Sequence, residues 1–110
     1  MQTTRCIPSS IFAHCLWGVQ THRDEWRSAE ISLGECLLLF TSLDAVHSYI
    51  AGCDDAREAG LHPQLFSRNR KEFGRGARQA AAEGFVGALF DAMPGPGEAP
   101  FLRFARIEQE

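Results

Sequence analysis

The hydrophobic pattern of the chain changes its period near the middle. Residues 36–40 are five consecutive apolar residues, which is typical of a strand buried on both faces. After them, Leu43, Val46 and Ile50 recur at helical spacing. We therefore expect a buried strand that is followed by a helix at about 43–52, which folds back over the sheet.

The expected helix has signals at both of its ends. Thr41 and Asp44 have the spacing of a capping box, in which the hydroxyl accepts from an N–H of the first turn and the carboxylate returns the bond. Gly52 lies where a left-handed residue commonly ends a helix. We therefore expect Thr41 and Gly52 to bound this helix.

Alternation of apolar and polar residues predicts two strands before the buried one. These strands are expected at 9–20 and 29–33, and the three together form an antiparallel meander. Segment 61–66 contains Pro63, which has no N–H to donate to a ladder. We therefore expect this segment to be an edge strand or a connecting loop.

A second helix is expected at about 69–83. Asn69 can cap it, Glu72 can close a capping box, and Gly84 ends it. Its apolar stripe is made of small residues and one aromatic residue, namely Phe73, Ala77, Ala80 and Ala81. Strands are expected at 85–92 and 101–107, joined by a hairpin loop at 94–100 that is rich in Pro and Gly.

Together these elements predict an α+β domain with an antiparallel or mixed sheet of four to five strands and two helices packed on one face. The 110 residues, 45% of them apolar, fit one domain over 1–110, with a flexible arm at 1–8. No signal peptide is recognised, and no apolar run approaches the roughly 20 residues that span a bilayer. We therefore expect a cytoplasmic protein with no membrane partner.

A basic segment lies at 68–78, although the net charge of -3 argues against a surface given over entirely to nucleic acid. Lys71, Arg75 and Arg78 follow the spacing i, i+4, i+7 and share one side of the expected helix, while two further cations, Arg68 and Arg70, lie near its N-terminus. One interpretation is a site for phosphate, nucleic acid or an acidic protein surface. The other is a solvated helix face opposite the alanine stripe.

Two further candidates are a tryptophan and an acidic cluster. Trp26 lies among charged residues, where it is either an exposed contact for a protein partner or a loop residue that covers the core. Asp54, Asp55 and Glu58 could hold a cation, but they lack the alternation of a calcium loop. A solvated helix start is the default interpretation of these carboxylates.

The four cysteines show no CxxC pair, so we expect structural thiols, with Cys15 and Cys36 acting as small apolar residues inside strands. His14 and Cys15 are adjacent, and neighbouring strand residues point to opposite faces, so they cannot act as base and nucleophile for each other. We expect no catalytic residue, no metal site and no cofactor.

Two short segments resemble a known family. Leu39-Phe40-Thr41-Ser42, with Ala45 and Tyr49 in the helix that follows, is similar to the strand, Phe-Thr-Ser, helix element of small bacterial domains like the N-terminal domain of SseB. Segment 82–88, Ala-Glu-Gly-Phe-Val-Gly-Ala, resembles the helix-to-strand junction of such domains. The resemblance implies a small bacterial α+β domain with a non-enzymatic role, and it carries over no functional residue.

These observations favour binding over catalysis. We expect a small non-enzymatic protein-interaction or regulatory domain that binds a protein partner or associates with itself through an open sheet edge. Two alternatives stay open. One is anion or nucleic-acid binding through the basic helix 68–78, and the other is a small enzyme that depends on a Cys or a His.

Overall fold

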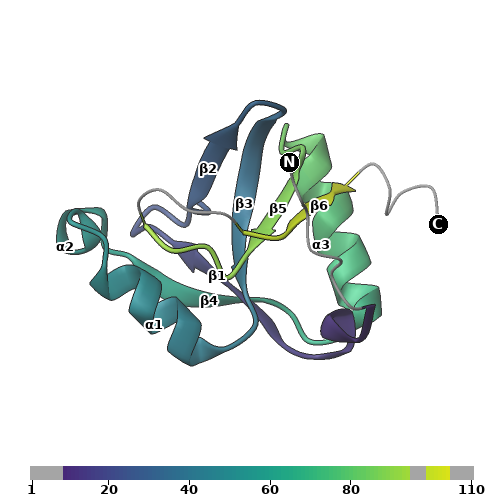
Figure 1. Cartoon of the computed structure of the whole chain (residues 1–110), viewed down its shortest axis with the longest axis horizontal. Coiled ribbons are helices and arrows are strands. Elements are labelled where there is room, and N and C mark those ends of the chain that lie inside the picture. Colours follow the sequence, from purple (N-terminus) through teal and green to yellow (C-terminus); the bar gives the residue numbers. More distant parts are fainter. Residues whose placement is uncertain (1–8, 95–98, 105–110) are drawn as a thin grey trace.

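The computed structural model describes residues 9–94 and 99–104 and contains a six-stranded mixed sheet with helices on both sides (Figure 1). The strands are β1 (Leu16–Gln20), β2 (Ser28–Ile31), β3 (Gly34–Phe40), β4 (His62–Ser67), β5 (Gly87–Phe90) and β6 (Phe101–Arg103). The helices are the short 3-10 helix η1 (Ser9–Ala13), α1 (Leu43–Ala51), α2 (Ala56–Ala59) and α3 (Arg70–Ala82). The predicted α+β class is confirmed.

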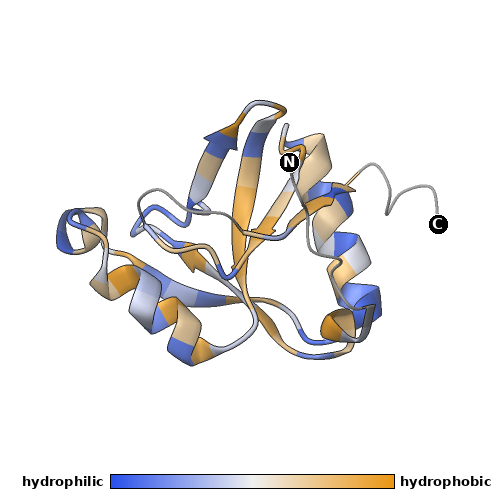
Figure 2. Ribbon diagram, viewed as in Figure 1, coloured by the Kyte–Doolittle hydropathy of each residue, from blue (hydrophilic) through white to orange (hydrophobic). Residues whose placement is uncertain are grey.

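Strand β3 is the centre of the sheet, and it is orange over most of its length in Figure 2. The strand order is β4-β1-β3-β5-β6, and β2 pairs with β3 as well. Strands β1 and β2 are antiparallel to β3, whereas β5 is parallel to it. All five residues of the predicted apolar run, 36–40, are buried.

The two long helices lie on opposite faces of the sheet, so the prediction that both pack on one face was wrong. Leu37 and Leu39 pack in one core cluster with residues of α3, whereas Leu38 and Phe40 pack in a second cluster with residues of α1. Successive side chains of a strand point to opposite faces. A strand that is apolar on both faces therefore needs a cover on each side, and the period of the pattern alone does not say which helix supplies it.

The first predicted strand is shorter than expected, because 9–13 forms η1 and only Leu16–Gln20 is a strand. Ile11 and Phe12 pack against the α3-side cluster, and the Phe12 ring centroid lies 4.5 Å from that of Phe73. The Phe12 ring centroid also lies 6.4 Å from that of Phe90 in β5, so Phe12 is covered by residues of both a helix and a strand. Cys15, which was expected inside the strand, lies just before it and is exposed.

Helix α1 is capped by a different residue from the one predicted. The Ser42 hydroxyl, not that of Thr41, accepts from the Ala45 N–H at 3.1 Å. Gly52 ends the helix with a right-handed φ of -87°, so the predicted left-handed cap was wrong. The left-handed glycine is Gly60, with a φ of 65°, which closes α2.

Helix α3 begins as predicted, because the Asn69 side chain accepts from the Glu72 N–H at 2.9 Å. The returning bond differs, since the Glu72 carboxylate accepts from the Arg68 N–H at 2.9 Å. Strand β4 lies at the sheet edge despite Pro63, as expected. The predicted hairpin is confirmed where β5 pairs with β6, while 1–8, 95–98 and 105–110 lie outside the described residues.

One buried hydroxyl in the described structure has no hydrogen-bond partner there. Ser67 is 1% exposed, and its Oγ atom is left unpaired. Removing such a group relieves the cost of burying it, so we expect Ser67→Ala to raise the free energy of unfolding by about 1 kcal/mol. Urea titration tests this, with the exposed Ser32→Ala as the control. A loss of stability in Ser67→Ala would mean that the hydroxyl has a partner.

Candidate functional site

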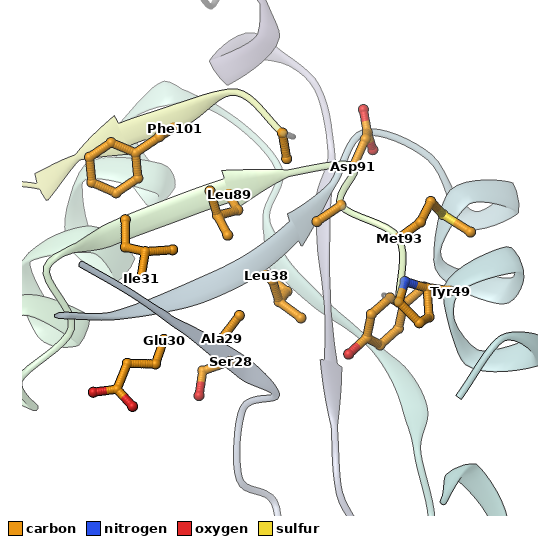
Figure 3. Close-up of a pocket in the computed structure, with 13 residues that line it drawn as sticks. Ser28, Ala29, Glu30, Ile31, Leu38, Tyr49, Leu89, Asp91, Met93 and Phe101 are labelled. Atoms are coloured by element: carbon orange, nitrogen blue, oxygen red, sulfur yellow. The ribbon is translucent and has the colours of Figure 1, made fainter. Parts of the chain in front are cut away.

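A cavity of about 750 Å³ lies on the α1 side of the sheet, beside the helix (Figure 3). Leu38 of β3 and Leu89 of β5 form its floor, and Phe101 of β6 and Met93 stand at its sides. The complete lining consists of Ser28, Ala29, Glu30, Ile31, Leu38, Tyr49, Leu89, Asp91, Ala92, Met93, Pro94, Ala99 and Phe101. This volume is within the range of sites that hold a small ligand.

The cavity exists because α1 covers only part of its sheet face. The helix packs mainly against β1, β3 and β4, and within the described residues no helix makes comparable contact with the same face of β2, β5 and β6. The turn after β5 is held next to the start of α1 by Asp91, whose two carboxylate oxygens accept from the N–H and the hydroxyl of Thr41 at 2.9 and 2.8 Å. Asp91 has a φ of 55°, a left-handed conformation that Asp tolerates better than most residues.

A buried tyrosine and an ion pair support the cavity at its α1 end. Tyr49 lines the cavity and is 7% exposed, and this burial raises the pKa of its hydroxyl, an effect that the neighbouring Arg27 opposes. The Arg27 Nη2 atom donates to both carboxylate oxygens of Asp55, at 2.8 and 2.6 Å. This hydrogen bonding raises the pKa of Arg27 and lowers the pKa of Asp55. Asp55 therefore links the start of α2 to the segment before β2, and it lies at a partly exposed helix start, as expected.

The lining of the cavity is apolar with a negative bias. Two acidic residues, Glu30 and Asp91, lie at its border, and none of the described residues that line it is Lys, Arg or His. In Figure 3 the Glu30 carboxylate points away from the cavity, at the opposite end from Asp91. The site offers apolar contact area and favours a bound group with positive rather than negative charge.

The predicted basic residues divide into two groups. Arg68 forms an ion pair with Glu72 at 2.8 Å, and Arg70 lies over the Phe12 ring, 5.9 Å from its centroid. The other three, which are Lys71, Arg75 and Arg78, are exposed on α3, away from the buried Phe73, Ala77 and Ala80. The structure thus brings three of the five cations together on one helix face, and the anion-binding hypothesis stays a prediction.

Trp26 is half-buried and packs against the α3-side core cluster. Its ring lies over Gly18, where any side chain would collide with it, and its centroid is 5.6 Å from that of Phe66. This packing supports the interpretation of Trp26 as a residue that covers the core. Its position on the α3 side separates it from the cavity.

The cysteines in the described part of the chain are free thiols. Cys15 is exposed, Cys53 is half-buried, and the burial of Cys36 raises the pKa of its thiol. Within residues 9–94 and 99–104, no group of three or more His, Cys, Asp or Glu side chains is placed to hold a metal ion. In the same residues, no helix combines the length and the hydrophobicity needed to cross a membrane.

The cavity was not predicted from the sequence, although the sequence contains one sign of it. In the predicted alternating strand 29–33, Ala29 and Ile31 share one side, and both line the cavity. The sequence gives only a weak sign that Asp91 holds the turn after β5 next to α1, namely that this aspartate directly follows an apolar segment. Neither a protein family nor a curated protein matches this sequence.

Proposed function

We propose that this chain is a small non-enzymatic protein-interaction domain that binds an apolar segment of a partner protein in the cavity beside α1. The observation that carries this proposal is the 750 Å³ cavity whose floor, Leu38 and Leu89, belongs to the core strands of the sheet. The apolar side chains that line the cavity lose contact with water when a partner covers them, and such burial contributes roughly 25 cal/mol per Å² of apolar surface.

Three further features support a protein segment as the occupant. Met93 is 53% exposed at the side of the cavity, and its flexible side chain adapts to different partners. The negative bias of the lining suits a partner segment that carries Lys or Arg. The proposal also includes the resemblance to SseB-type domains, which implies the same non-enzymatic role.

The test uses a displayed library of random peptides selected on the immobilised protein. Peptides that bind in the cavity are expected to lose about tenfold or more in affinity when Ile31→Glu places a charge in its lining. Leu33→Glu is the matched control, because Leu33 is 50% exposed, is two residues away and does not line the cavity. This control is expected to retain the affinity of the unchanged protein.

Charge reversal on α3 separates this proposal from the anion-binding alternative. The triple variant with Lys71, Arg75 and Arg78 changed to Glu is expected to bind the selected peptides normally. Equal effects of Ile31→Glu and Leu33→Glu, or binding that only the α3 variant abolishes, would contradict the proposed function. Selection of a sequence from this chain itself would instead identify a second copy as the partner.

A further inference from the structure

Strand β2 has one unpartnered edge beside the cavity. It pairs with β3 along its other edge, and no strand in the described part of the chain pairs with the free one. The Leu38 N–H donates to the Arg27 carbonyl at 3.3 Å, so the carbonyl of residue 27, just before β2, points to β3. Because antiparallel pairs alternate between bonded and non-bonded positions, the N–H and C=O groups of Ser28 and Glu30 point to the free edge.

The two faces of β2 differ in chemistry. Ala29 and Ile31 lie on the cavity face. Glu30 lies on the other face directly opposite Glu35, whose carboxylate accepts from the Ser28 hydroxyl at 2.6 Å. Both glutamates are exposed, and no ion pair within residues 9–94 and 99–104 involves either of them. Two like charges on directly paired residues destabilise a sheet unless a cation lies between or beside them.

We infer that the partner segment binds as an added strand along the free edge of β2, with apolar residues alternating with Lys or Arg. This inference rests on the proposed function and specifies its geometry. Backbone groups of the segment bond to Ser28 and Glu30, as in other cases of strand addition. The residue opposite Glu30 shares its face and is basic, whereas the residues opposite Ala29 and Ile31 share the cavity face and are apolar.

The same geometry disfavours a second copy of β2 as the added strand. Pairing two copies of this four-residue strand brings further carboxylates to the face that already holds Glu30 and Glu35. Natural edge strands use charges in this way to prevent association with themselves. A basic partner segment relieves the repulsion, so the charge selects the partner as well as protecting the edge.

The experiment uses the synthetic peptide acetyl-Val-Lys-Val-Lys-Val-Lys-Val-amide and the full chain. Its affinity is compared with that of the peptide in which Glu replaces each Lys, and with that of an isomer in which the three Lys are consecutive. The alternating Lys peptide is expected to bind about threefold to tenfold more tightly than either. Glu30→Lys is expected to reverse the preference between the Lys and Glu peptides, while Glu58→Lys, an exposed change of equal charge on α2, leaves it unchanged.

Amide hydrogen exchange, followed by NMR, identifies the binding mode independently of affinity. Bound peptide is expected to slow exchange at the Ser28 and Glu30 amides by about tenfold or more, because these groups become hydrogen-bonded. Binding with no protection at these two amides overturns the inference, and so does binding that is indifferent to the order of charges. If library peptides depend on Ile31 while these peptides do not bind, the inference fails and the proposed function stands.

Discussion

Replacement of Phe40 by alanine is expected to lower the free energy of unfolding by about 3–5 kcal/mol. Phe40 is fully buried at the end of β3, and its ring centroid lies 5.3 Å from that of Tyr49. It belongs to the cluster that fixes α1 to the sheet, together with Val19 and Val46. Truncation removes apolar contacts and leaves a void between the strand and the helix. The expected loss of stability therefore includes both the lost burial of the ring and the cost of the empty space.

Urea titration followed by circular dichroism measures this loss. Leu33→Ala is the control, because Leu33 is half-exposed in the turn between β2 and β3, and its truncation is expected to change stability by less than about 0.5 kcal/mol. A loss below about 1 kcal/mol for Phe40→Ala would mean that β3 is not the buried centre of the sheet.

Gly87→Ala is expected to destabilise the protein by about 1–3 kcal/mol or more, as overpacking of a dense core does. A Cβ atom at Gly87 would overlap the Leu102 carbonyl oxygen and come within 2.6 Å of the Phe101 ring. Strand β6 has to move away from β5 to accommodate it, because one of the colliding atoms is backbone. Phe101 lines the cavity, so the same variant is expected to weaken peptide binding.

The matched control is Gly74→Ala in α3, where the nearest atom to the added Cβ is the end of the flexible Arg78 side chain at 3.6 Å. Alanine is the better helix former by about 1 kcal/mol, so this variant is expected to be more stable than the unchanged protein. Thermal unfolding of both variants makes the comparison. Equal behaviour of the two glycine variants would show that β5 and β6 are not in close contact.

The elements with the strongest periodicity could be predicted from the sequence. The apolar run 36–40 predicted the buried strand, and Asn69 with Glu72 predicted the start of α3. Pro63 predicted an edge strand or a connecting loop at 61–66, and β4 is an edge strand. In each case a local rule acts, because the residues that determine the structure are close in the chain.

The features that failed depend on contacts between distant segments. Thr41 has a hydroxyl that could cap a helix, but this hydroxyl donates to Asp91, which is far along the chain. The Ser42 hydroxyl caps α1 instead. Ile11 and Phe12 alternate with their neighbours like strand residues, yet they lie in a short helix that packs against the α3-side cluster. The cavity depends on how far α1 reaches across the sheet, which no spacing within the helix encodes.

The parallel pairing of β3 with β5 has a consequence for the order of folding. Strands β1, β2 and β3 and helix α1 follow one another closely, so their contacts close short loops. The contact between Thr41 and Asp91, in contrast, joins residues 50 positions apart, and the β3–β5 ladder spans a similar length. Non-local parallel pairing is slow to form, so the β5 side of β3 is paired late. During synthesis, one edge of β3 therefore keeps its backbone groups unpaired until residues 87–90 have been made, and this exposed edge can aggregate.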